Sequence, residues 1–219
     1  MKRHPSLPWI LPFLLFLILL ALLPQVGMGP RVDGIIRLTL VGGVLVFYSR
    51  RVVDLRIRHW VSSGLLGVVV FLVWIGPDLL FAGWRDLPIF RNPLTVDAGG
   101  FPAEGVSDPV AVTLRIIRAA VLVPIIEEMF WRGWLPRWII NPDFEKVPLG
   151  TYTALAFGVT AVLFASEHGA WWDVGLAAGV AYNWWMLRTR SLGDCILAHA
   201  VTNACLAGYV IATGRWEYW

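Results

Sequence analysis

The sequence predicts an all-α fold, a polytopic bundle of about seven transmembrane helices. Only 15% of the 219 residues are charged and 58% are hydrophobic, whereas soluble domains carry roughly 25% charged residues. The apolar residues are gathered in runs long enough to cross a bilayer. Many of the 13 tryptophans lie at the ends of these runs, as in the aromatic belts of membrane proteins. These observations indicate an integral membrane protein.

The apolar runs give the predicted spans in chain order: 7–23, 34–48, 61–81, 110–140, 149–168, 172–187 and 192–212. The first run is longer than a signal-peptide core and lacks a small-x-small cleavage site, so we expect it to be retained. Segment 83–109 is rich in Pro, Gly and Asp and predicts an irregular extramembrane loop. The fourth run predicts one long helix, intact or broken. We therefore divide the chain into a three-span region, 1–109, and a core, 110–219.

The distribution of Lys and Arg predicts a cytoplasmic N-terminus. With that orientation, eleven of the 18 basic residues fall in cytoplasmic segments and four in outer segments. The remaining three lie within predicted spans: Arg37, Arg115 and Arg118. Such short clusters are topology signals, and no nucleic-acid partner is expected. The basic segment 49–60 contains interleaved Val, Leu and Ile, so it fits an interfacial segment on anionic lipid and a cytoplasmic turn equally well.

The fourth run contains charged residues, which are energetically unfavourable in such apolar surroundings. Glu127, Glu128 and Arg132 lie within six positions, and each ionisable group near a bilayer centre costs roughly 2.5–3.5 kcal/mol. On a helix Glu128 and Arg132 share a face, in the favourable order for an ion pair, while Glu127 points about 100° away from Glu128. Pro124 lies one turn earlier and is expected to kink the helix and open space beside Glu127. The alternative is an ion-pair network that only locks helix packing.

Two later spans also carry polar side chains. His168 ends the fifth run, and His199 and Asn203 lie four residues apart on one face of the seventh. A lone histidine in a span more often hydrogen-bonds between helices. Because polar side chains in spans face the bundle interior, we expect these three residues to meet the two glutamates around one wet cavity. In the seven-span topology they converge only near or above the midplane, unless the fifth span is tilted or shorter than drawn.

These residue types favour hydrolysis of an acyl bond, in particular a peptide bond, by activated water. A carboxylate beside an imidazole can take a proton from water and return it to a leaving group. A second histidine and an asparagine amide can stabilise an oxyanion, each donor by roughly 3–4 kcal/mol. No Gly-x-Ser-x-Gly motif is present. Two histidines and two carboxylates are acceptable zinc ligands, but His-Glu-x-x-His is missing, so we expect neither a metal nor another cofactor.

Three motifs in order resemble the CPBP family, the CAAX proteases and bacteriocin-processing enzymes. They are Glu-Glu-x-x-x-Arg (Glu127, Glu128, Arg132), Phe-x-x-x-His (Phe164, His168) and His-x-x-x-Asn (His199, Asn203). The resemblance covers about residues 110–207 and implies a glutamic-type intramembrane endopeptidase. By this resemblance Glu127 and His168 activate the water, His199 and Asn203 form the oxyanion hole, and Glu128 and Arg132 organise the site.

Three further sequence segments look closest to the bacterial branch of this family that accompanies exosortase sorting systems. These segments are residues 143–150, 188–192 and 195–203. It implies a multi-pass protein of the bacterial inner (plasma) membrane whose partners are lipids, a membrane-associated or C-terminally processed protein substrate, and exosortase-system proteins. Two alternatives are a non-catalytic membrane scaffold or partner-binding factor, and a transporter, although no inverted repeat is visible.

Overall fold

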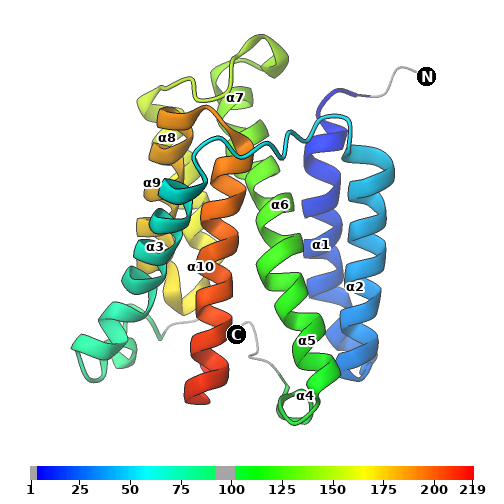
Figure 1. Ribbon diagram of the computed structural model, residues 1–219, viewed down its shortest axis with the longest axis vertical. Helices are drawn as coiled ribbons and strands as arrows, with labels where there is room; N and C mark the ends of the chain where they lie inside the picture. Colours follow the sequence, from blue (N-terminus) through cyan, green and yellow to red (C-terminus); the bar gives the residue numbers. More distant parts are fainter. Residues whose placement is uncertain (1–3, 92–101) are drawn as a thin grey trace.

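The computed structural model describes residues 4–91 and 102–219, which form an all-α bundle without strands in those ranges (Figure 1). The predicted fold class, a polytopic membrane helical bundle, is confirmed. Two parts of the sequence predictions lie outside the described residues. They are the basic residues Lys2 and Arg3 and the middle of the predicted loop, 92–101.

The N-terminal region contains three long helices. They are α1 (Leu7–Val26), α2 (Pro30–Val44), extended by a π-helical turn (Leu45–Ser49), and α3 (Trp60–Leu80). Gly27 ends α1 with φ 67°, a left-handed conformation that glycine adopts without steric cost. Segment 50–59 is not helical and crosses one end of the bundle between α2 and α3 (Figure 1). It is tied to α10 because the backbone N–H groups of Arg58 and His59 donate to Asp194 Oδ1 at 3.0 and 2.8 Å.

The glutamates lie on a long helix in which α-helical segments alternate with π-helical turns. Its segments are α5 (Pro109–Ile117), the π turn η3 (Arg118–Leu122), α6 (Val123–Glu128), the π turn η4 (Met129–Trp134) and α7 (Leu135–Ile140). The prediction of one long helix over 110–140 therefore agrees with its path. Isolated π turns occur frequently at functional sites. Here they flank the six residues of α6 that carry Glu127 and Glu128.

The C-terminal helices are α8 (Ala154–Ser166), α9 (Trp172–Thr189) and α10 (Leu192–Thr213). Short helical turns complete the description: η2 (Trp84–Asp86), α4 (Ala103–Val106), η5 (Phe144–Lys146), η6 (Gly169–Trp171) and η7 (Trp216–Tyr218). The order of the elements follows the predicted order of spans.

The predicted count of seven spans is wrong by the criterion of length and hydropathy. Among the described residues, five helical segments are long and apolar enough to cross a membrane: 7–26, 30–49, 60–80, 109–140 and 192–213. The fifth predicted span begins late because Gly150 adopts φ 72° and Thr153 caps α8, accepting a hydrogen bond from Ala156 N at 3.2 Å. That helix, α8, has only 13 residues. The sixth, α9, has 18 residues but carries several polar side chains.

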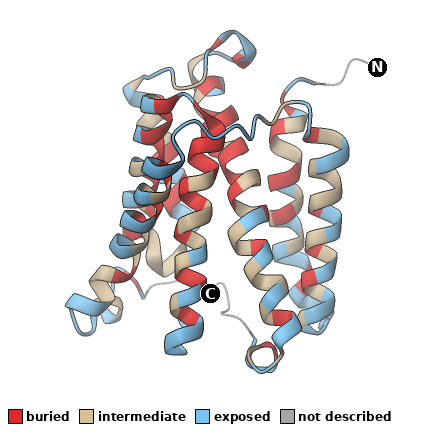
Figure 2. Ribbon diagram, in the orientation of Figure 1, coloured by how far each residue is buried: buried red, intermediate tan, exposed pale blue. Residues whose placement is uncertain are grey.

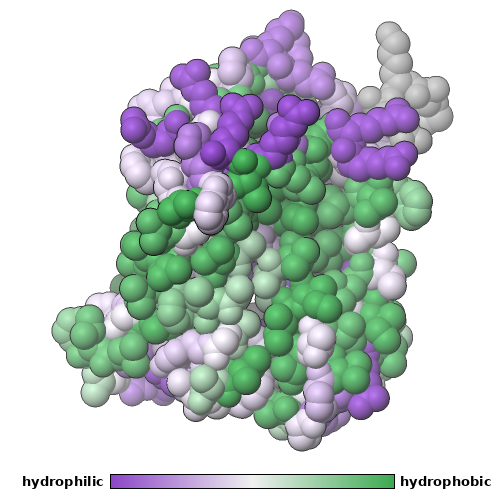
Figure 3. Space-filling view, in the orientation of Figure 1, coloured by the Kyte–Doolittle hydropathy of each residue, from purple (hydrophilic) through white to green (hydrophobic). Residues whose placement is uncertain are grey.

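The packed core lies where α6, α9 and α10 meet, and the outward faces of the helices are exposed (Figure 2). A broad apolar surface covers the middle of the bundle, and hydrophilic side chains gather at the end crossed by segment 50–59 (Figure 3). This distribution fits a lipid-facing belt below a polar face. The cytoplasmic assignment of that polar face stays a prediction.

The backbones of α3 and α10 approach each other closely at Gly67. A Cβ atom at this position would lie 2.4 Å from the carbonyl oxygen of Ala198 and 2.7 Å from Cβ of Val201. Only glycine therefore permits α10 to pack this closely on α3. This contact fixes the depth of α10, the helix that carries His199.

Candidate active site

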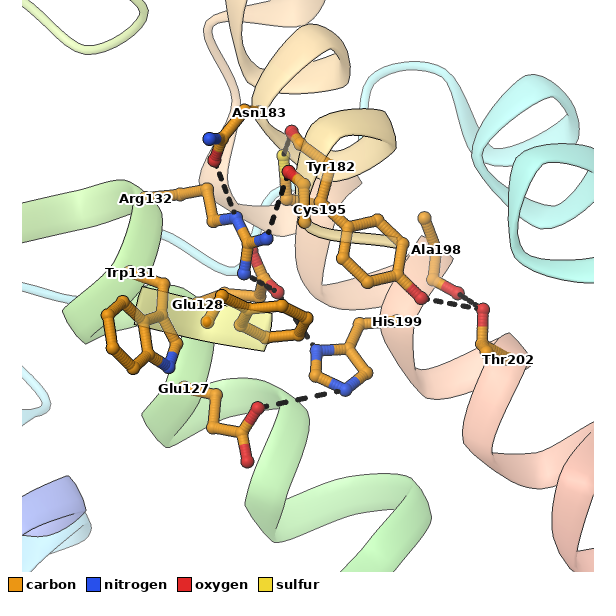
Figure 4. Close-up of polar contacts among 12 residues, drawn as sticks. Glu127, Glu128, Trp131, Arg132, Tyr182, Asn183, Cys195, Ala198, His199 and Thr202 are labelled. Carbon is orange, nitrogen blue, oxygen red and sulfur yellow. Dashed lines mark hydrogen bonds and ion pairs between the residues drawn. The ribbon is translucent and has the colours of Figure 1, made fainter. Parts of the chain in front are cut away.

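Glu128 is the centre of a buried charged network. Its Oε1 atom lies 3.0 Å from Nη1 of Arg132, one helical turn along the same helix, and 2.9 Å from Nδ1 of His199 on α10 (Figure 4). The Glu128 and Arg132 side chains are fully buried. The i, i+4 ion pair predicted from the sequence is thus present in the structure. It joins the long helix to α10 as well as neutralising the guanidinium.

Arg132 is held on its other sides by α9. Its Nε atom donates to Asn183 Oδ1 at 3.2 Å and its Nη2 atom to the carbonyl of Gly179 at 3.4 Å. The guanidinium carbon also lies 4.4 Å from the ring centroid of Phe164 and 5.2 Å from that of Tyr182. Carbonyl, amide and aromatic faces therefore surround the charge, as a buried arginine requires.

Glu127 points away from this network toward a cavity of about 200 Å³. The cavity is bounded by α3, the long helix, α8, α9, α10 and the C-terminal turn. The Oε2 atom of Glu127 lies 4.0 Å from Nε2 of His199 (Figure 4). Among the described residues this buried oxygen has no hydrogen-bond partner. His168, His199 and Asn203 line the same cavity, so the carboxylate faces both imidazoles and the amide.

The hydrogen bond of His168 defines its tautomer. Nδ1 lies 2.8 Å from the carbonyl oxygen of Phe164, which can only accept, so Nδ1 carries the proton. In the neutral ring Nε2 then holds a lone pair. Two contacts fix the ring: Trp74 packs edge-on at 5.1 Å between centroids, and Gly175 leaves room, because a Cβ there would lie 3.1 Å from Nδ1. Nε2 of His168 is therefore available as a hydrogen-bond acceptor.

Asn203 is positioned by an irregularity of the long helix. The N–H of Val123 donates to Arg118, five residues earlier, and the next residue, Pro124, has no N–H to continue this π register. The carbonyl of Ala119 instead accepts a hydrogen bond from Asn203 Nδ2 at 2.8 Å. The amide nitrogen has two N–H groups, so one remains for the cavity. The proline expected to open space beside Glu127 also anchors the asparagine of α10.

The six predicted site residues form two layers. Four line the cavity, and Glu128 and Arg132 lie behind them. In the predicted topology His168 lies at the far end of the fifth span, away from the end at which the seventh span begins. The structure reduces this separation because α8 starts at Ala154, five residues later than predicted. At 1.5 Å per residue this brings His168 about 7 Å nearer the end at which α10 begins. Their chemical roles stay predictions.

Sequence reasoning missed a supporting layer on α9 and α10. Tyr182 stacks on His199 with ring centroids 5.1 Å apart and donates a hydrogen bond to Thr202 at 2.7 Å. Thr202 also contacts the carbonyl of Gly67 at 2.9 Å, and Asn183 holds Arg132. Two signals were available: Asn183 is a polar residue in an apolar run, and Thr202 lies three residues from His199 on the same helix face.

In the part of the chain that the structure describes, no group of three or more His, Cys, Asp or Glu side chains is arranged to hold a metal ion. Each of the two histidines of the site has one ring nitrogen engaged in a contact with the protein. One nitrogen of His199 already contacts Glu128, and one nitrogen of His168 contacts a backbone carbonyl. The site thus presents single nitrogen and oxygen atoms to the cavity.

Comparison with known families finds one match in the region that carries this site. Residues 109–205 match the family model described as type II CAAX prenyl endopeptidase Rce1-like. The matched segment contains all six predicted site residues and supports the resemblance to the CPBP family. No curated protein matches the chain. No solved structure matches it either.

Proposed function

We propose that the chain is a CAAX-type intramembrane endopeptidase of the CPBP family that hydrolyses a peptide bond by glutamate-activated water. One observation carries the proposal. Glu127 on the long helix, His168 in the turn after α8, and His199 and Asn203 on α10 all open onto the same cavity. The match of residues 109–205 to the type II CAAX prenyl endopeptidase model supports the reaction class.

In this mechanism the water lies between the carboxylate of Glu127 and Nε2 of His168. As the water oxygen attacks the carbonyl carbon of the scissile bond, its proton passes to this pair, which holds an ionised carboxylate and a ring lone pair. Collapse of the tetrahedral intermediate breaks the C–N bond. The same proton then passes to the departing amine, so the site returns to its starting charge.

The oxyanion is stabilised from α10. The free N–H of the Asn203 amide is one donor. The other is His199, whose Nδ1 proton is held by Glu128, so Nε2 can donate only when the ring is doubly protonated. Glu128 and Arg132 thus act on the substrate indirectly, because Glu128 holds both Arg132 and Nδ1 of His199 and so fixes the orientation of the imidazole.

The finer assignment follows from the sequence resemblance. We place the protein in the exosortase-associated bacterial branch, in the inner membrane with its N-terminus in the cytoplasm, acting on a membrane-associated or C-terminally processed protein. Its cavity lies between membrane-spanning helices, which supports a substrate delivered within or at the surface of the bilayer. The described cavity residues provide the catalytic groups without a cofactor.

The test replaces Glu127 by Gln in the native host and compares the N- and C-terminal ends of membrane proteins between the two strains. The variant preserves size and removes the negative charge. We expect one precursor to persist uncut while the variant protein reaches normal abundance in the membrane. A matched Glu104→Gln variant, outside the catalytic cavity on α4, should process the precursor like the parent chain.

The competing function is a membrane scaffold or partner-binding factor of a sorting system. Under that function Glu127→Gln leaves both the phenotype and every terminus unchanged. Loss of Glu128 or Arg132 would then have the dominant effect, because it breaks the buried network that joins the long helix to α9 and α10. A comparison of Glu127→Gln with a variant that lacks Glu128 or Arg132 therefore distinguishes the enzyme from the scaffold.

A further inference from the structure

Six exposed arginines lie at the polar end of the bundle. Four belong to segment 50–60, which leads into α3, and two lie at the C-terminal end of α9: Arg50, Arg51, Arg56, Arg58, Arg188 and Arg190. In the part of the chain that the structure describes, no ion pair or hydrogen bond joins their guanidinium groups to another residue. Segment 50–60 contains one carboxylate, Asp54, so positive charge is in large excess.

The two groups of arginines are brought together at the start of α10. Ser191, which directly follows Arg190, donates through Oγ to the carbonyl oxygen of Arg56 at 3.2 Å. A Cβ atom at Gly193 would lie 2.4 Å from the same carbonyl oxygen, so α10 begins directly against segment 50–60. Segment 50–60, Arg188 and Arg190 therefore form one surface, which we call the basic surface.

Exposed apolar side chains are interleaved with these arginines. Leu55 and Ile57 are 54% and 48% exposed and alternate along the chain with Arg56 and Arg58, and Trp60 is 71% exposed. Tryptophan and arginine are typical of the membrane interface, where the ring lies at the headgroup level and the guanidinium extends to the polar side. In Figure 3 the hydrophilic side chains form a band directly above the broad apolar belt. The basic surface is thus continuous with the lipid-facing surface.

The backbone of the basic surface is already fixed. Asp194 on α10 is fully buried, and besides the N–H groups of Arg58 and His59 it contacts Nδ1 of His59 at 3.1 Å. At Arg56 and Arg58 these contacts use backbone atoms, so both guanidinium groups stay available to a ligand. A surface fixed before binding loses little conformational entropy when the ligand arrives.

We propose that the basic surface binds the headgroups of anionic phospholipids. The planar guanidinium matches a phosphate with two parallel hydrogen bonds. Each arginine near an anionic membrane surface strengthens binding by about fivefold. The acyl chains of the same lipid extend past Trp60 onto the apolar belt, which a soluble acidic protein would not cover. None of the residues that line the catalytic cavity belongs to this surface, so the inference is independent of the proposed function.

The test measures lipid affinity of the purified chain in detergent by native mass spectrometry. Phosphatidylglycerol and phosphatidylcholine with the same acyl chains are titrated separately, so the two ligands differ in headgroup charge alone. We expect the anionic lipid to bind at least about tenfold more tightly than the zwitterionic one. Its stabilisation of the protein against heat should weaken at about 1 M salt, where the screening length falls to about 3 Å.

Arg56→Gln combined with Arg58→Gln should weaken phosphatidylglycerol binding by roughly tenfold to thirtyfold and leave phosphatidylcholine binding unchanged. Both changes preserve the backbone contacts with Ser191 and Asp194. The corresponding double lysine variant keeps the charge and should retain most of the preference, which separates lost charge from a damaged fold.

The matched control combines Arg91→Gln with Arg215→Gln. It removes the same charge at the opposite end of the bundle, where Arg91 pairs with Asp86 at 2.6 Å and Arg215 with Glu217 at 2.7 Å. The preference for phosphatidylglycerol should persist in this variant. An equal loss in the control would assign the preference to net charge and overturn the inference.

Three further results would overturn it. The first is equal affinity of the parent chain for the two lipids, and the second is an unchanged preference in the double glutamine variant of Arg56 and Arg58. The third concerns a protein partner: a soluble hexaglutamate peptide that binds as tightly as phosphatidylglycerol and displaces it would assign the basic surface to an acidic protein segment.

Discussion

Nδ1 of His199 lies 2.9 Å from Oε1 of Glu128, the same oxygen that Arg132 contacts at 3.0 Å. One carboxylate oxygen thus joins an imidazole on α10 to a guanidinium on the long helix. It fixes the proton on Nδ1 and leaves Nε2 directed toward Glu127, 4.0 Å away. Adjacent glutamates have separate functions in this arrangement: Glu128 orients a partner and Glu127 faces the cavity.

Glu128→Gln should destabilise the protein far more than Glu127→Gln. The first change breaks a fully buried ion pair, which typically costs roughly 3–5 kcal/mol. Among the described residues the ion-pair contact of Glu127 is the long one to His199, at 4.0 Å, so its replacement should leave the melting temperature close to that of the parent chain. Thermal unfolding in one detergent measures both. Equal melting temperatures for the two variants would contradict the separate functions.

Asn203→Ala should lower kcat by roughly a hundredfold to a thousandfold with little change in KM, because an oxyanion donor acts mainly in the transition state. The same change also removes the hydrogen bond to the carbonyl of Ala119, worth about 1 kcal/mol of stability. Steady-state kinetics on the precursor identified in the host provides the measurement. A rise in KM at constant kcat would assign Asn203 to ground-state binding.

Gly67→Ala should disrupt the packing of α3 on α10. The added methyl would lie 2.4 Å from the carbonyl oxygen of Ala198, and overpacking of this kind costs typically 1–3 kcal/mol. Gly64→Ala is the matched control, because a Cβ there meets nothing within 4 Å and alanine favours the helix. We expect lower stability and activity only for Gly67→Ala. Equal melting temperatures for the two variants would refute this packing account.

Tyr182→Phe and Tyr182→Leu separate two contacts of one side chain. The phenylalanine retains the stacking on His199 and loses the hydrogen bond to Thr202, so stability should fall by about 1 kcal/mol with most activity retained. The leucine loses the aromatic face that orients the imidazole, so activity should fall further than stability alone explains. Activity and melting temperature are measured on both variants. Equal activities would show that stacking has no role.

The sequence predicted the cavity residues because charge inside an apolar run is a strong signal. Glu127, Glu128, His168, His199 and Asn203 were all expected around one cavity. Four of them line it, and Glu128 lies behind them in the buried ion pair with Arg132. Helical spacing alone separated Glu127 from Glu128. These predictions depend on local periodicity, which the membrane-spanning helices preserve.

The sequence did not predict the features that depend on backbone irregularity or on tertiary contacts. The late start of α8 depends on the positive φ of Gly150 and the cap at Thr153, inside a run that hydropathy alone assigns to a span. The π turns around α6 change register within apolar sequence that periodicity does not distinguish from an α-helix. The contact of Tyr182 with His199 joins two helices, and no spacing rule reports it.

The measurement that tests the central claim most directly compares the parent chain, Glu127→Gln and Glu127→Asp on the host precursor, using purified protein in nanodiscs. The account predicts that Glu127→Gln lowers kcat by at least about a hundredfold, the usual contribution of a general base, at an unchanged melting temperature. Glu127→Asp should recover part of the rate, because it restores the carboxylate at a shorter reach. Cleavage of the precursor by Glu127→Gln at the parent rate would contradict the account.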